Sequence, residues 1–67
     1  MNAQPEVRMG NDIARQFAHL PYDKATAAIA THLRTFWDPR MRNALRRAVA
    51  AGDSDVDPLL RDATAKL

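Results

Sequence analysis

The chain of 67 residues contains no cysteine, and this absence excludes several kinds of site and of covalent stabilisation. Disulfides, iron–sulfur clusters and the usual structural zinc sites all require cysteine sulfur. Thirteen of the apolar residues are alanines, so large apolar side chains are scarce. A chain this short buries only about 60% of the surface that its unfolded state exposes. Because small domains without disulfides or metals often gain stability by associating, the composition is consistent with a chain that packs against a partner.

Glycine, histidine and serine are also scarce, which argues against catalysis. The two glycines, Gly10 and Gly52, lie far apart, so the sequence has no Gly-rich loop to cradle a phosphate or a dinucleotide. His19 and His32 fall in different segments, and metal sites need several converging ligands. Ser54, the only serine, has no histidine near it in sequence. We therefore predict that the chain is not an enzyme and has no catalytic residue, no cofactor-binding residue and no metal ligand.

Long apolar runs are absent as well. No run approaches the roughly 20 residues that a helix needs to cross a bilayer. The segment from Met1 to Met9 lacks the charged-then-apolar layout of a secretory signal. We therefore expect a soluble, cytoplasmic chain that does not interact with membranes.

Helical signals, by contrast, occur four times. The first segment runs from about Glu6 to Leu20, with Pro5 suited to the first helical position and Pro21 ending the helix. Its predicted apolar stripe is Met9, Ile13, Phe17 and Leu20. The second segment starts near Asp23, a plausible N-cap, and continues to Phe36 or Trp37. Its predicted apolar face is Ala25, Ala28, Ile29, His32, Leu33 and Phe36, with His32 half-buried.

Two Asp-Pro pairs mark the remaining helices, because aspartate caps a helix and proline suits its first position. The pair at 38–39 begins a helix to about Ala51, with Gly52 as a left-handed C-terminal cap. The pair at 57–58 begins a short helix to about Lys66. The expected apolar positions are Met41, Ala44, Leu45, Ala48 and Val49, then Leu60, Ala63 and Leu67. We predict an all-α fold, a small bundle of three main helices plus a short C-terminal fourth helix, forming a single domain (1–67) that frays at residues 1–5 and at the extreme C-terminus.

Basic residues concentrate in the middle of the chain. Between Lys24 and Arg47 there are six basic residues and one acid, Asp38, a net charge of +5, whereas the remaining residues carry −3. The total of +2 is small for a dedicated nucleic-acid-binding protein. The basic segment still leaves open an alternative, a small helical DNA-binding regulator that uses its third helix. A self-associating helical module is a third possibility.

The segment from Phe36 to Arg42 joins the second and third predicted helices and contains the only tryptophan. We expect Phe36 to pack in the core. Trp37 has two interpretations, a core residue or an exposed interface anchor beside arginines. The arginines in and around this segment are either a solvated face or contacts to a partner; they are Arg34, Arg40, Arg42, Arg46 and Arg47.

At these residues the chain resembles the small delta subunit of NAD-dependent, molybdenum-containing formate dehydrogenases. The most specific matching element is Phe36-Trp37-Asp38-Pro39-Arg40-Met41-Arg42, preceded by His32-Leu33-Arg34. Two further matching elements are Asn11-Asp12-Ile13-Ala14 with Phe17, and Asp57-Pro58-Leu59-Leu60-Arg61-Asp62-Ala63. The resemblance covers nearly the whole chain.

The resemblance implies a non-catalytic accessory subunit of a cytoplasmic complex, supporting the assembly or stability of the enzyme. Other subunits would carry the molybdenum–pterin cofactor, the iron–sulfur clusters and the flavin, and would bind NAD. The partners would be the other formate dehydrogenase subunits, including the catalytic subunit, and nucleic acid is not expected. Our main hypothesis assigns partner binding to Phe36, Trp37, Asp38, Pro39, Arg40, Met41 and Arg42. It predicts that Trp37→Ala or Arg40→Glu releases the subunit and leaves its helicity largely intact.

Overall fold

The computed structural model describes residues 4–67, which form four helices and no strand. The helices are α1 (Pro5–Phe17), α2 (Tyr22–Phe36), α3 (Pro39–Ala50) and α4 (Pro58–Thr64). This confirms the predicted all-α fold of three main helices and a short fourth. Of the residues expected to fray, 1–3 lie outside the described residues, and Pro5 is already the first residue of α1. Fraying at the extreme C-terminus stays a prediction, although Lys66 makes two hydrogen bonds to α2.

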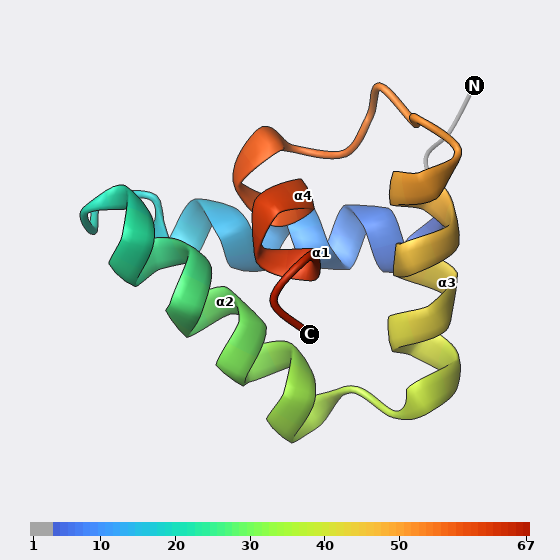
Figure 1. The fold of residues 1–67 in the computed structure, drawn as a ribbon, viewed down its shortest axis with the longest axis horizontal. Coiled ribbons are helices and arrows are strands. Elements are labelled where there is room, and N and C mark those ends of the chain that lie inside the picture. The colour runs from blue at the N-terminus through green and yellow to red at the C-terminus, as the bar shows by residue number, and fades with distance from the viewer. Residues whose placement is uncertain (1–3) are drawn as a thin grey trace.

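The two central elements of the bundle are α1 and α4. Figure 1 shows α4 in front of α1, with α2 on one side and α3 on the other. Both α2 and α3 pack against α1 and α4, and they join each other through the short connection at residues 37–38. The buried apolar core is formed by Val7, Ile13, Ala14, Ile29, Leu33, Trp37, Leu45, Ala48, Val56, Leu60 and Ala63. None of the described helices has the length and apolar character needed to cross a membrane.

The buried face of α1 differs from the predicted stripe. It consists of Val7, Gly10, Ile13 and Ala14, and Met9 is 41% exposed. Compared with the prediction, α1 is rotated about its own axis, because Gly10 faces Leu60 of α4. A Cβ atom built on Gly10 would lie 2.7 Å from Leu60 Cδ2. Glycine therefore allows α4 to approach α1 closely. The predicted end of α1 was also wrong, because residues 18–20 form a turn before Pro21.

The start of α2 departs from the prediction in one detail. Pro21 occupies the N-cap position and Asp23 lies within the first turn, where its carboxylate makes no capping hydrogen bond. A negative charge is favourable there because of the helix dipole. The buried face is Ala25, Thr26, Ile29, Ala30 and Leu33. This face lies to one side of the predicted stripe, so that His32 is half-buried and Phe36 is exposed.

The predicted N-caps of α3 and α4 are confirmed. Asp38 Oδ1 accepts a hydrogen bond from the Met41 backbone N–H at 2.9 Å, and Asp57 Oδ1 accepts one from the Leu59 N–H at 2.8 Å. In both helices proline follows the capping aspartate, at a position where its missing N–H costs no helical hydrogen bond. Local sequence therefore determines where these two helices begin.

The predicted cap at Gly52 is confirmed as well. Gly52 has φ of +73°, a left-handed conformation that favours glycine. The Gly52 N–H donates to the Val49 carbonyl at 3.0 Å, and the Asp53 N–H donates to the Ala48 carbonyl at 3.1 Å. These two bonds define a Schellman motif, which ends α3 and directs the chain into the loop at residues 53–57.

One side chain of α1 holds that loop. Asn11 Nδ2 donates to the Asp55 carbonyl at 2.8 Å, and Asn11 Oδ1 accepts from the Asp57 N–H at 2.9 Å. The amide thus satisfies a donor and an acceptor of the loop immediately before α4. Val56, between the two contacts, is buried. Asn11 therefore fixes the direction from which α4 enters the core.

Candidate functional site

We define the corner as residues 36–42, the connection between α2 and α3 together with its first helical residues. The structure divides these residues into an inward and an outward group. Trp37 is buried, and Met41 and Arg42 are half-buried. The exposed members are Phe36, Asp38, Pro39 and Arg40. The corner therefore combines a buried support with an exposed surface.

Of the two interpretations of Trp37, the structure supports the core residue. Only 7% of Trp37 is exposed. Its backbone is extended, with φ of −96° and ψ of 139°, because Trp37 is the C-cap of α2 rather than a helical residue. The change of backbone direction turns the indole towards the inner side of the corner. The large apolar ring is part of the core cluster, together with Leu33 of α2 and Leu45 of α3.

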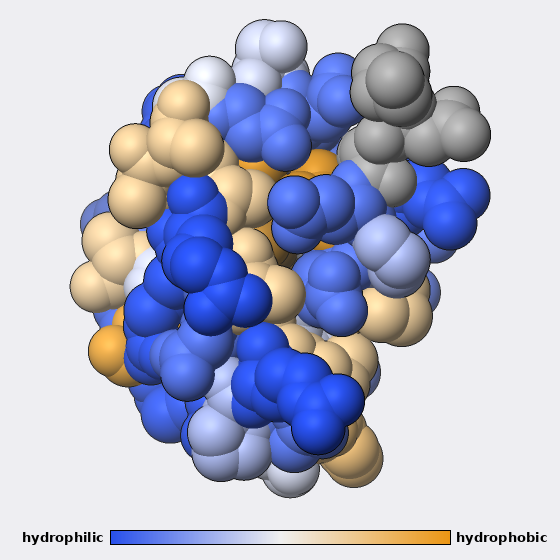
Figure 2. All heavy atoms as spheres, turned by 90° about the vertical axis from the view of Figure 1, so that its right-hand side faces the viewer, coloured by the Kyte–Doolittle hydropathy of each residue, from blue (hydrophilic) through white to orange (hydrophobic). Residues whose placement is uncertain are grey.

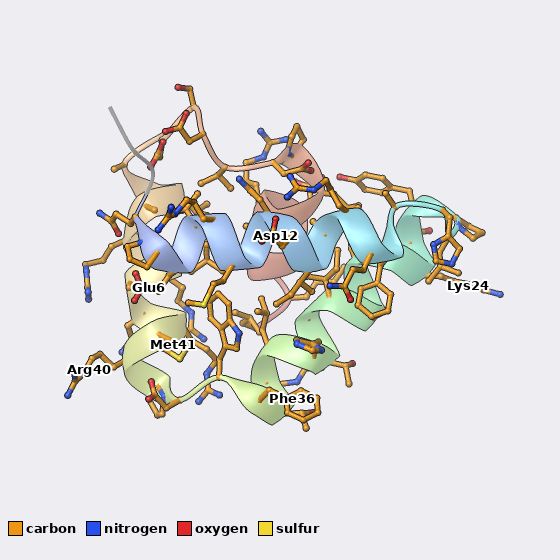
Figure 3. All side chains as sticks on the ribbon, turned by 180° about the vertical axis from the view of Figure 1, so that it is seen from behind. Glu6, Asp12, Lys24, Phe36, Arg40 and Met41 are labelled. Atoms are coloured by element: carbon orange, nitrogen blue, oxygen red, sulfur yellow. The ribbon has the colours of Figure 1, made fainter. Side chains whose placement is uncertain are left out.

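Phe36 takes the opposite orientation, so the expectation that it packs in the core is wrong. It is the last residue of α2 and is 70% exposed. Figure 3 shows its ring pointing away from the bundle at the end of the helix. Its ring contacts that of His32, one turn earlier, with 4.8 Å between ring centroids and 44° between planes. The solvent-facing aromatic of the corner is therefore Phe36.

Arg42 connects α3 to the end of α2. Its Nη1 donates to the Trp37 carbonyl at 2.7 Å and to the Arg34 carbonyl at 3.3 Å. These carbonyls lie at the C-terminal end of α2, where a helix leaves acceptors unsatisfied and where a positive charge is favourable. Although sequence reasoning counted Arg42 among the partner contacts, its guanidinium is engaged within the chain. We infer that Arg42 fixes the angle between the two helices.

Replacing Arg42 tests this supporting role. We expect Arg42→Met, which keeps a long apolar stem, to lower the free energy of unfolding by about 1–2 kcal/mol. The physical reason is the loss of two hydrogen bonds and of the charge at the end of α2. Urea denaturation followed by circular dichroism measures the change.

The control for this variant is Arg47→Met, on the exposed side of α3. A surface substitution of this kind should change the free energy of unfolding by less than about 0.5 kcal/mol. If Arg42→Met is as stable as Arg47→Met, Arg42 does not support the corner.

The exposed side of α3 is rich in arginine. Arg40, Arg46 and Arg47 are exposed there, and in Figure 2 the face of the molecule formed by α3 is largely hydrophilic. Arg46 Nη1 donates to Asn43 Oδ1 at 2.8 Å. Among residues 4–67 the ion pairs are Arg15 with Asp12 and Arg61 with Asp62, so the exposed α3 arginines have no carboxylate partner in that range.

The acidic residues of the chain serve mainly local structure. Asp38 and Asp57 cap helices, and Asp53 Oδ1 accepts from the Asp55 N–H at 2.9 Å. Within residues 4–67, no group of three or more histidine or carboxylate side chains converges to hold a metal ion. No pocket is found in the described part of the molecule.

Comparison with known protein families gives a match over most of the chain. A family model described as the NADH-dependent formate dehydrogenase delta subunit FdsD matches residues 7–64, a range that includes the whole corner and α2, α3 and α4. No curated protein and no solved structure matches the chain.

Proposed function

This chain belongs to the family of NADH-dependent formate dehydrogenase delta subunits, and we propose that it is a non-catalytic accessory subunit that binds another subunit of the complex through its corner. Its role in this proposal is to support the assembly or stability of the cytoplasmic enzyme. The partner surface belongs to the catalytic subunit or lies beside it. In this proposal the cofactors of the complex are carried by other subunits, and this chain has no cysteine with which to bind an iron–sulfur cluster.

The exposure of Phe36 is the observation that carries the proposal. An aromatic side chain that is 70% exposed gains little from the folded chain itself. Placed in a pocket of a partner, the same ring would bury roughly 150–250 Å² of its surface, much of it apolar. The cores of protein interfaces are enriched in arginine and in aromatic residues, phenylalanine among them. Phe36 and Arg40 supply one of each on the same corner.

The rest of the corner supports this surface by making it rigid. Trp37 packs beneath it, Asp38 caps α3, and Arg42 connects α3 to α2. Because these contacts already exist in the free chain, little conformational entropy is lost when the corner binds. Met41, half-buried beside the exposed residues, can fill an apolar gap at the edge of the interface. Of the seven residues assigned to partner binding, Phe36 and Arg40 therefore face the partner in this proposal, whereas Trp37, Asp38 and Arg42 hold the corner in place.

Two substitutions on the exposed part of the corner test the proposal. We expect Phe36→Ala and Arg40→Glu each to weaken binding to the rest of the formate dehydrogenase complex by at least about tenfold, and the double variant to be released. Both side chains are exposed, so the circular dichroism spectrum should be unchanged. Co-purification with the tagged complex, quantified by mass spectrometry, measures the loss.

Lys24→Glu is the matched control, since it makes the same charge change on an exposed side chain. Figure 3 shows Lys24 at the end of the molecule opposite Arg40. This control should co-purify at the wild-type ratio. Retention of the Phe36→Ala/Arg40→Glu double variant at that same ratio would place the interface elsewhere.

A further inference from the structure

The charge distribution of α3 is unusual among the helices of this chain. Its 12 residues include four arginines and no acidic residue. The first turns of α1 and α2 each contain an acid, Glu6 and Asp23, whereas the first turns of α3 and α4 contain none. Arg40 instead places a positive charge near the positive end of the helix dipole, which is unfavourable. Arg47, in the last turn, is placed favourably with respect to the dipole, so Arg40 is the arginine that gains nothing from its own helix.

Three of these arginines form one outward surface, which we call the arginine face: Arg40, Arg46 and Arg47. At 100° per residue they lie on the side of α3 opposite the buried Leu45 and Ala48. They extend along roughly 10 Å of the helix. Arg42 is excluded, because its guanidinium is turned towards the end of α2. Arg40 also belongs to the corner, so the arginine face and the corner are continuous.

We propose that the arginine face binds an acidic surface of the protein partner that holds the corner. This inference rests on the proposed function and deepens it by naming the chemistry of the partner. The carboxylates of such a surface would supply the counter-charges that residues 4–67 do not provide on α3. Complementary charges of this kind chiefly increase the rate of association and orient the partner.

Charge placement favours an acidic protein over a nucleic acid. Asp53 and Asp55 follow directly after the C-terminal end of α3, and Asp38 precedes its first residue. A phosphate backbone running along the helix would meet a carboxylate beyond each end. An acidic patch on a protein can be confined to the length of the three arginines. The small net charge of +2 also gives weak attraction to a polyanion.

Association kinetics of the full chain test the arginine face. The probe is the formate dehydrogenase complex purified without this subunit and immobilised on a sensor, with binding recorded between 50 and 500 mM NaCl. For Arg46→Gln/Arg47→Gln we expect an association rate constant about tenfold lower at the lowest salt, a shallower salt dependence and a nearly unchanged dissociation rate constant. Phe36→Ala should instead mainly increase the dissociation rate constant.

Two controls separate the arginine face from total charge. Arg46→Lys/Arg47→Lys keeps the charge and should keep the association rate constant within about twofold. Arg15→Gln/Lys24→Gln removes the same charge from exposed positions of α1 and α2 and should have a much smaller effect. If Arg15→Gln/Lys24→Gln slows association as much as Arg46→Gln/Arg47→Gln does, the total charge of the molecule sets the association rate. The proposed role of the arginine face is then refuted.

The remaining outcomes distinguish this inference from the proposed function. If Phe36→Ala is released while Arg46→Gln/Arg47→Gln binds with wild-type kinetics at every salt concentration, the arginine face fails and the corner stands. If neither variant differs from wild type, both proposals fail. Binding of the chain to nucleic acid is measured separately, by fluorescence anisotropy with a 20-base-pair DNA duplex at 150 mM NaCl. If the chain binds the duplex more tightly than it binds the complex, the proposal that the arginine face binds an acidic protein surface is refuted.

Discussion

Trp37→Ala is expected to lower the free energy of unfolding by about 3–5 kcal/mol, the range for removing a buried aromatic from a core. A domain of this length has a total stability of roughly 3–10 kcal/mol. The substitution should therefore leave a large fraction of the isolated chain unfolded at 25 °C. The helical circular dichroism signal and its thermal unfolding curve measure this loss.

The physical reason lies in the position of Trp37 at the end of α2. The indole is 7% exposed and packs in the same core cluster as Leu33 and Leu45, which come from the two helices that it joins. Removing it leaves a cavity where those helices meet. The sequence-based hypothesis predicted that Trp37→Ala would release the subunit with its helicity intact, and burial of the indole contradicts the second half of that prediction.

The neighbouring residue is the control. Phe36→Ala removes an aromatic ring of similar type that is 70% exposed, so its free energy of unfolding should stay within about 0.5 kcal/mol of wild type. Trp37→Phe should retain much of the stability, because a large apolar ring still occupies the core. A Trp37→Ala chain with wild-type thermal stability would show that the indole does not support the corner.

Gly10→Ala should destabilise the chain by about 1–3 kcal/mol, although alanine is the better helix former by about 1 kcal/mol. The new Cβ would lie 2.7 Å from Leu60 Cδ2 and 3.1 Å from Leu60 Cδ1. Leu60 is completely buried, so its side chain has little room to move away. Either α4 is pushed off α1, or Leu60 adopts a strained rotamer. Urea denaturation gives the free energy of unfolding.

A double-mutant cycle isolates this contact. Leu60→Ala alone should cost about 2–5 kcal/mol, through lost burial and the cavity left behind. In the double variant Gly10→Ala/Leu60→Ala, the alanine methyl enters space that the leucine has vacated. The double variant should therefore be more stable than the sum of the two single effects by about 0.5–3 kcal/mol. Effects that add to within about 0.5 kcal/mol would mean that the two residues do not restrict each other.

The helix ends show how far local sequence can be interpreted. The starts of α3 and α4 and the glycine cap after α3 were predicted, because each depends on atoms within a few residues of one another. Asp38 caps the N–H three residues ahead, and Gly52 takes a left-handed conformation that other residues avoid. The end of α1 and the start of α2 were less well predicted, because α1 stops at Phe17 rather than at Leu20 and Pro21 rather than Asp23 is the N-cap of α2.

The candidate site shows where local sequence is insufficient. Phe36 and Trp37 are adjacent aromatics, and both were compatible with the core or with an interface. Which one points inward depends on a single change of backbone direction at Trp37, where α2 has ended. Likewise, the hydrogen bonds from Arg42 to the end of α2 appear only when α3 is placed against α2. No pattern in the linear sequence distinguishes Arg42 from Arg40.

Composition, helical periodicity and capping residues were thus sufficient to establish an all-α chain, the order and approximate length of its helices, and a chain without cysteine chemistry. They act over one or two turns of helix, where neighbours in sequence are neighbours in space. The rotation of α1 and the exchange of roles between Phe36 and Trp37 depended instead on packing between distant segments. Gly10 and Leu60 are 50 residues apart and meet only in the folded bundle, so the direction in which each face points is a property of the assembled core.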